Sequence, residues 1–160
     1  MATAPSTEQL LSRRELRAWR GLLRVHARLV KALDAELEST HGLGVTSYEV
    51  LMYLADSPEA RMRMHDLAAS VLLSRSGLTR LADRLEREGL IERKACESDA
   101  RGAFAVLTAA GRAKLTAARR THLDGVRRHF CEHLSDAELD HLGAIWEKVA
   151  PGVHDPPAQT

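Results

Sequence analysis

Polar and basic side chains gather at the start of one helical pattern in this chain. The cluster comprises Ser74, Arg75, Ser76, Thr79 and Arg80. Guanidinium groups form bidentate hydrogen bonds with guanine, and hydroxyl groups adapt to several base edges, so these residue types at a helix tip are suited to the major groove of double-stranded DNA. Arg84 lies one turn further along the same pattern, where we expect it to reach a backbone phosphate.

A charged turn follows this helical pattern, between two short segments with strand character. The segments are 90–95 and 103–107, and the turn between them carries Asp99 and Arg101 and is closed by Gly102. A narrow minor groove concentrates negative potential and attracts an inserted arginine. We therefore expect Arg101 to enter the minor groove beside the helix, with Asp99 stiffening the loop.

Each of these two elements alone also fits a structural role, the helix as a solvated amphipathic face and the turn as an ordinary hairpin loop. Their order along the chain favours the DNA-binding interpretation. A short helix at 65–71 precedes the basic helix at 74–88, and the hairpin follows it directly. A helix, a second helix and a two-stranded hairpin in this order form a winged helix-turn-helix.

The basic helix at 74–88 has a well-defined apolar face and a well-defined end. Gly89 is placed as the glycine that takes a left-handed conformation after the helix, which lets Leu90 fold back in a Schellman motif. The apolar stripe is predicted to comprise Leu78, Leu81, Ala82 and Leu85.

A long helix is expected upstream, over residues 9–40, ended by Gly42 or Gly44. Its apolar residues are spaced alternately by three and four positions, which is typical of a helix that packs along another helix. Thr46 and Glu49 have capping-box spacing, predicting that a further helix starts there. The apolar seam comprises Leu16, Trp19, Leu23, His26, Val30, Leu33 and Leu37.

Two helices are expected downstream. The first runs from 109 to about 133, and the last is opened by a capping box of Ser135 and Glu138 and carries its apolar face from Leu139 to Val149. Terminal helices with apolar faces and no sheet to cover indicate a helical layer shared by two subunits. The predicted fold is therefore mainly α, a winged helix-turn-helix module flanked by N- and C-terminal helices that form a dimerisation layer.

The predicted boundaries divide the chain into five segments. They are an N-terminal tail (1–8), an N-terminal dimerisation helix (9–44), the winged helix-turn-helix module (45–108), C-terminal dimerisation helices (109–150) and a C-terminal tail (151–160).

Composition and charge agree with one globular DNA-binding chain. The 160 residues are 44% hydrophobic, enough for a core, and only 4% aromatic, which disfavours platforms that stack single-stranded bases. Residues 61–128 contain 15 lysines and arginines against 8 aspartates and glutamates, although the whole chain has a net charge of only +1. The N-terminus lacks a secretory pattern and no apolar run has membrane-spanning length, so we expect a cytoplasmic protein that does not enter a membrane.

The stretch from the basic helix through the hairpin resembles the MarR family of transcription regulators. The matching residues are Ser74-Arg75-Ser76, Thr79-Arg80-Leu81, Asp83-Arg84-Leu85-Glu86, Gly89-Leu90-Ile91-Glu92-Arg93, Asp99, Arg101, Leu107-Thr108 and Gly111. The resemblance implies a homodimer on a pseudo-palindromic operator, with helix 74–88 in the major groove and Arg101 in the minor groove. It also implies an effector pocket between the helical arms and the winged module. Ala100 stands where family members often carry an arginine, so the wing relies on Arg101.

Several side chains are candidates for sensing a signal. If a small aromatic acid binds, Trp19, His26 and Met64 are candidate pocket walls. His129 and His133 are four positions apart, as metal ligands on a helix would be, but no acidic or cysteine partner converges on them and we interpret them as surface histidines. Cys96 and Cys131 are interpreted as reduced thiols of a cytosolic protein, and the first helix has no cysteine for the peroxide sensing known in one branch of the family.

The sequence therefore predicts a dimeric, sequence-specific regulator of double-stranded DNA, most simply a ligand-responsive repressor, that needs no cofactor or metal. It lacks a phosphate-binding glycine loop, a nucleophile elbow and any paired carboxylates, so no enzymatic activity is expected. Two alternatives remain open: a metal-dependent regulator of the same fold, and a helical protein-interaction module that does not bind DNA.

Overall fold

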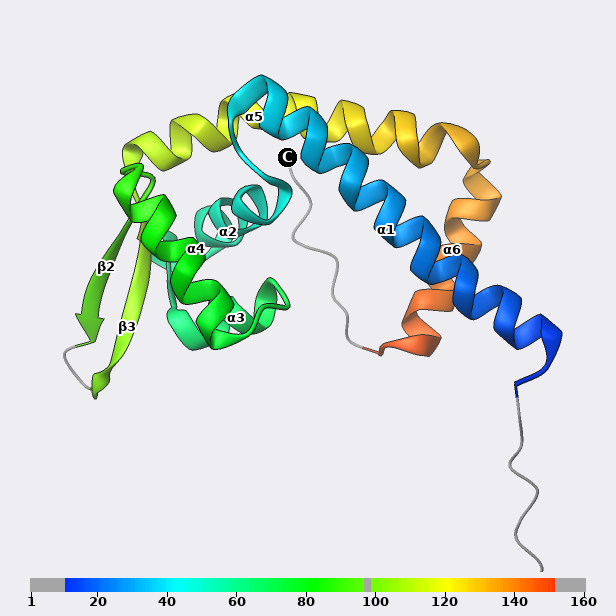
Figure 1. The fold of residues 1–160 in the computed structure, drawn as a ribbon, viewed down its shortest axis with the longest axis horizontal. Coiled ribbons are helices and arrows are strands. Elements are labelled where there is room, and N and C mark those ends of the chain that lie inside the picture. Colours follow the sequence, from blue (N-terminus) through cyan, green and yellow to red (C-terminus); the bar gives the residue numbers. More distant parts are fainter. Residues whose placement is uncertain (1–10, 97–98, 152–160) are drawn as a thin grey trace, which may run out of the picture.

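The computed structural model describes residues 11–96 and 99–151, except for the side chains of residues 96 and 99–101. It is mainly helical, and Figure 1 shows long helices bracketing a smaller module, which confirms the predicted class. The elements are α1 (Arg13–His41), α2 (Val45–Asp56), a 3-10 turn (Pro58–Ala60), β1 (Arg61–Arg63), α3 (Met64–Ser70), α4 (Arg75–Arg87), β2 (Ile91–Cys96), β3 (Asp99–Leu107), α5 (Ala109–His129), a 3-10 turn (Cys131–His133) and α6 (Asp136–Val149).

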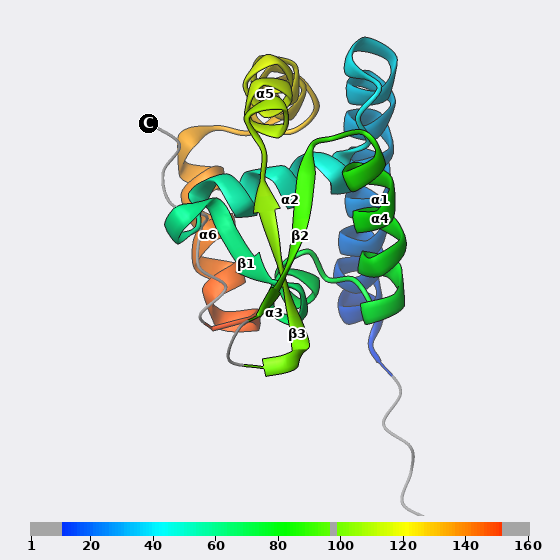
Figure 2. The ribbon, with the colours of Figure 1, turned by 90° about the vertical axis from the view of Figure 1, so that its left-hand side faces the viewer.

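A three-stranded antiparallel sheet of order β1-β3-β2 forms the wing, and its hairpin extends away from α5 alongside α4 (Figure 2). The predicted turn was wrong in one respect, because Asp99 and Arg101 belong to strand β3. Ala95 pairs with Ala103 and Cys96 pairs with Asp99, so a bulge absorbs the extra residues and pairing continues toward the tip.

The core lies under the winged module, where α2, α3, α4 and the sheet meet. Leu37 of α1 and Ala118 of α5 join the same buried cluster and connect the module to the long helices. The predicted stripe of α4 is confirmed, with Leu78, Ala82 and Leu85 fully buried and Leu81 partly buried.

The backbone of Leu90 is the corner at which α4, the wing and α5 meet. The Leu90 N–H donates to the Leu85 carbonyl at 2.9 Å, and Gly89 has φ +72°, which confirms the predicted Schellman motif. The Leu90 carbonyl accepts from the Thr108 N–H at 3.2 Å. The same carbonyl oxygen lies 2.0 Å from where a Cβ on Gly111 would be, so α5 approaches this corner as closely as a glycine allows.

Helix starts were predicted well only where the cap is local. Ser135 and Glu138 form the predicted capping box, and Ser12 and Glu15 form another that begins α1. The capping box predicted at Thr46 and Glu49 was wrong. Helix α2 begins at Val45, whose N–H donates to the Asp34 carboxylate of α1 at 2.8 Å, so a side chain from another helix caps it.

Helix α5 ends at His129, four residues earlier than predicted. Phe130 leaves the helical region with φ −131°, and a short 3-10 turn leads to α6. The end is held against α1, because the Glu36 carboxylate accepts from Arg128 and contacts His129 Nε2, each at 2.7 Å. Gly125 lets the two helices approach here, since a Cβ would lie 2.8 Å from Leu33 and Glu36 atoms.

Helices α1 and α6 carry large apolar side chains that remain exposed to solvent in the single chain. On α1 the predicted seam splits, with Leu37 buried but Trp19 and Leu23 about half exposed. Helix α6 has no buried residue, although Leu142 and Trp146 share a groove with α1. No described helix has both the length and the apolar character needed to cross a membrane.

We expect Gly111→Ala to lower the free energy of unfolding by about 2–3 kcal/mol, because the added methyl group would overlap the Leu90 carbonyl and force α5 away from it. Chemical denaturation followed by circular dichroism measures the change. Gly143→Ala is the matched control: its Cβ meets no atom within 4 Å, so alanine should raise stability slightly. Equal stability of the two variants would contradict the close approach at Leu90.

Candidate nucleic-acid interface

The first turn of α4 presents the predicted polar and basic residues to solvent. Its buried stripe faces the core, so Arg75, Ser76, Thr79 and Arg80 all lie on the exposed side. Ser74 is the N-cap, and its hydroxyl accepts from the Gly77 N–H at 3.0 Å and lies 3.2 Å from the Ser76 hydroxyl. Ser74 therefore fixes the helix start, while the arginines are available to a ligand.

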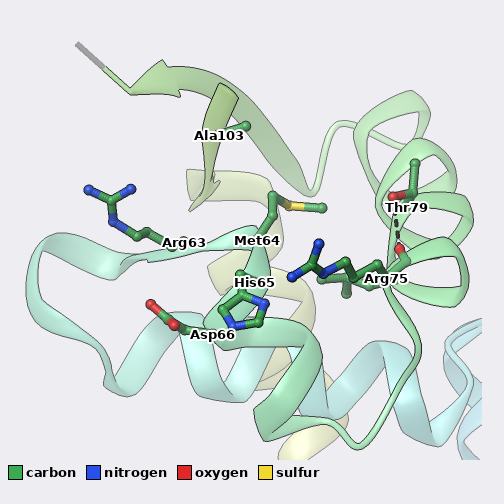
Figure 3. Close-up of a pocket in the computed structure, with 9 residues that line it drawn as sticks. Arg63, Met64, His65, Asp66, Arg75, Thr79 and Ala103 are labelled. Atoms are coloured by element: carbon green, nitrogen blue, oxygen red, sulfur yellow. Dashed lines mark hydrogen bonds between the residues drawn. The ribbon is translucent and has the colours of Figure 1, made fainter. Parts of the chain in front are cut away.

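A hollow of about 470 Å³ lies between this helix start and the wing (Figure 3). On the α4 side of the hollow, the Thr79 hydroxyl donates to the Arg75 backbone carbonyl at 2.9 Å. The Arg75 side chain extends over the hollow (Figure 3). The lining comes from four elements: Arg63 of β1, Met64, His65 and Asp66 of α3, Arg75, Leu78 and Thr79 of α4, and Gly102 and Ala103 of β3. The lining is mostly uncharged, but it carries two arginines, Arg63 and Arg75, against one acidic residue, Asp66, and such a concave surface suits contact with a phosphate backbone.

Arg93 of β2 holds the wing to α4. Its guanidinium donates to Glu86 at 2.7 and 2.9 Å and lies 2.7 Å from an Asp83 carboxylate oxygen. The Arg93 backbone N–H also donates to Glu86 at 2.9 Å. Hydrogen bonds from the Arg93 backbone and side chain hold the pKa of Glu86 below its usual range. The two guanidinium N–H groups converge on Glu86 Oε2, the Arg93 backbone N–H takes Oε1, and Nη1 lies beside Asp83, so several charge-assisted contacts hold β2 against α4.

Arg84 lies one turn along α4, as expected, and also contacts α2. Its Nη2 donates to the Ser47 hydroxyl of α2 at 2.8 Å, and its Nε lies 3.5 Å from a Glu88 carboxylate oxygen without a hydrogen bond. Ser47 is buried, so this contact ties the recognition helix to α2. The Arg84 side chain is still 43% exposed, and its contact with a phosphate stays a prediction. The contacts of Arg84 and Arg93 could not be predicted from residue spacing. Ser47, the partner of Arg84, lies 37 positions away, and Glu86, the partner of Arg93, lies on a different element.

The wing tip is described only in part. Asp99 and Arg101 lie in β3 at the far end of the hairpin, but their side chains are outside the described residues, so the minor-groove role of Arg101 remains a prediction.

The three residues proposed as walls of an effector pocket do not come together. His26 lines an apolar groove of about 670 Å³ between α1, the end of α5 and α6. Met64 lines the separate hollow beside α4, and Trp19, which is 54% exposed, lines neither. This grouping was wrong, because a helical pattern does not show which face of α1 turns toward the winged module.

The histidine pair is separated by the end of α5. His129 closes the helix and contacts Glu36, whereas His133 lies in the following 3-10 turn, so the two are not one turn apart on a helix. Among the residues that the structure describes, no three histidine, cysteine or acidic side chains are placed to share a metal ion. Cys131 is a free, half-buried thiol, and the Cys96 side chain is outside the described residues.

The chain is similar in sequence and structure to known regulators of transcription. The sequence model that describes the MarR family matches residues 41–102. AbsC, a MarR family transcriptional regulator from Streptomyces coelicolor, is 37% identical, with 89% of this chain and 95% of AbsC covered and a TM-score of 0.81. A second regulator of that family from the same organism, whose structure was determined in complex with DNA, is 34% identical, with 91% and 95% covered and a TM-score of 0.83. The transcriptional repressor MprA of Escherichia coli is 28% identical over 91% of this chain and 77% of its own length.

We expect Arg93→Met to raise the pKa of the Glu86 carboxyl toward its ordinary value of about 4.3, though only in part, because the backbone N–H of residue 93 still donates. Because the folded-state pKa of Glu86 is depressed, its contribution to stability is present above about pH 5 and is lost as the pH falls through the folded-state pKa. The variant should therefore be less stable than the native protein near neutral pH, with the difference shrinking in acid.

Titration of the glutamate carboxyl resonances by NMR, with unfolding measured at each pH, checks this. Lys94→Met is the control, since Lys94 is the exposed neighbour with only a 3.6 Å contact to Glu92. A Glu86 pKa that does not move on loss of Arg93 would refute the ion pair between Arg93 and Glu86.

Proposed function

The chain belongs to the MarR family of transcriptional regulators, and from this premise we propose that it is a repressor that binds a pseudo-palindromic DNA site as a homodimer. The observation that carries the proposal is the exposed basic start of α4, fixed to the wing by Arg93 beside a hollow of matching shape. Repression is supported by the described role of MprA, the E. coli relative.

In the proposed complex, the first turn of α4 lies in the major groove and the wing in the adjacent minor groove. Arg75 and Arg80 are the candidates for bidentate contacts with guanine, and Ser76 and Thr79 contact neighbouring base edges or phosphates. The backbone strand between the two grooves crosses the hollow lined by Arg63 and Thr79. Arg101 enters the minor groove.

The homodimer is supported by the apolar side chains that one chain leaves uncovered. The groove between α1 and α6 is almost wholly apolar, with Leu22, Val25, Phe130 and Trp146 among its walls. A second copy related by a twofold axis would cover this surface. It would also hold the two recognition helices about 34 Å apart, so that they enter successive major grooves. An effector regulates such a dimer only if it binds unequally to arrangements with different spacing.

We expect Arg75→Ala and Arg80→Ala each to weaken binding to a selected duplex about tenfold or more and to relax base preference at one position per half-site, because each removes a candidate base contact. Arg101→Ala should weaken binding with little change in fold. Arg120→Ala is the matched control, since Arg120 is a 93% exposed arginine on α5, remote from the interface.

Fluorescence anisotropy at several salt concentrations measures these affinities and separates phosphate from base contacts. Unchanged affinity in all three interface variants would refute the proposed contacts. A comparable loss of affinity in Arg120→Ala would show that the losses reflect the overall charge of the protein and not specific contacts.

We expect Leu22→Glu and Trp146→Glu to produce a monomer that no longer binds the selected duplex at nanomolar concentration, because a carboxylate on either residue would be buried in the shared groove. Sedimentation velocity gives the oligomeric state. Leu72→Glu is the control for added charge, since Leu72 is 92% exposed in the turn between α3 and α4. Dimers in all three variants would contradict this interface.

A further inference from the structure

His65 of α3 is an exposed histidine at the hollow between the start of α4 and the wing. Figure 3 shows its imidazole among the other side chains that line the hollow. Among the described histidines it is the one found there, whereas His26, His129 and His133 line the apolar groove of the arms. None of the DNA contacts proposed above involves it.

The His65 imidazole is not engaged in the fold. Within the part of the chain that the structure describes, it makes no hydrogen bond, ion pair or ring contact. Other histidines have such partners: His41 Nε2 lies 2.8 Å from the Thr121 hydroxyl, and His122 stacks on Tyr48. A polar ring that the fold leaves exposed, on a surface proposed to receive DNA, is a candidate contact for that DNA.

The charges that face His65 come from three elements. Arg63 of β1 and Arg75 of α4 are cations, Asp66 of α3 is an anion, and the described residues of β3 add no charge to the lining. Between pH 6 and pH 8, arginine and aspartate side chains generally keep their charges, whereas imidazole is the group whose charge changes in that range. The lining therefore carries a balance of +1 with a neutral imidazole and +2 with an imidazolium.

We propose that His65 contacts a DNA phosphate as the imidazolium and takes up a proton from solvent when the duplex binds. This inference rests on the proposed DNA-binding function and adds a contact to it. In the free protein, Arg63 and Arg75 disfavour a third positive charge in the hollow. A phosphate that lies across the hollow reverses this preference, because it attracts the imidazolium and accepts a charge-assisted hydrogen bond from it. Since proton uptake and duplex binding favour each other, affinity falls as the pH rises.

Fluorescence anisotropy with the full-length protein and the selected duplex, at pH 6 and pH 8 and several salt concentrations, tests this contact. The dissociation constant of the native protein should be about tenfold or more higher at pH 8, because each protomer loses a hydrogen bond to a charged group. The slope of log affinity against log salt should be steeper at pH 6 by about one unit per protomer, as expected for one more phosphate contact.

His65→Gln should bind with nearly the same affinity at both pH values, because its amide is neutral throughout. His65→Lys should bind as tightly at pH 8 as at pH 6, because it keeps its charge. His141→Gln is the matched control, since His141 is an exposed histidine on α6 outside the hollow, and it should keep the full pH dependence. Sedimentation velocity should give the same oligomeric state at both pH values, which separates this contact from the histidines of the apolar groove.

The same pH dependence in native protein and His65→Gln would overturn the proposal. So would equal salt slopes at the two pH values, an equal loss of pH dependence in His141→Gln, or dissociation of the dimer at only one pH. Tight binding that does not change with pH would refute the role of His65 and leave the repressor proposal intact. Failure to bind the duplex at either pH would instead refute the proposed function on which this contact rests.

Discussion

The geometry of the whole molecule depends on one peptide unit, that of Leu90. Its N–H closes the recognition helix onto the Leu85 carbonyl, and its carbonyl accepts from Thr108 at the end of the wing. The Thr108 hydroxyl then bridges this corner by donating to the Gly89 carbonyl at 2.7 Å and accepting from the Gly111 N–H at 3.0 Å. Helix α4, the wing and helix α5 therefore share one hydrogen-bonded corner, although the hairpin lies between the two helices in the sequence.

Two further contacts fix α4 relative to the wing and to α2. Arg93 fixes the wing to α4 through Asp83 and Glu86, and Arg84 fixes α4 to α2 through Ser47. The basic helix tip is thus positioned from two sides while its own arginines remain exposed. At the C-terminal end of α5, Glu36 fixes that helix to α1 through Arg128 and His129. In a dimer built on the α1–α6 groove, the relation between the two recognition helices would follow from these few contacts.

The sequence predicted most of what is encoded locally. The Gly89 Schellman motif, the Ser135–Glu138 capping box and the apolar stripe of α4 each depend on residues within one or two turns, so spacing alone was sufficient. Features set by remote partners were missed. Asp34 caps α2 from another helix, Ser47 binds Arg84 across 37 positions, and Glu36 lies 93 positions from His129. The same limit explains why Trp19, His26 and Met64 were grouped wrongly, since a helical pattern does not say which element each face contacts.

The most direct test of the account is selection of bound sequences from a pool of randomised duplexes by the full-length protein, followed by sequencing. Two rigid reading units related by a twofold axis predict an enriched inverted repeat whose half-sites are centred about one helical turn apart. Recovery of unenriched sequence, or of a single half-site without symmetry, would contradict the claim that this chain reads DNA as a symmetric pair.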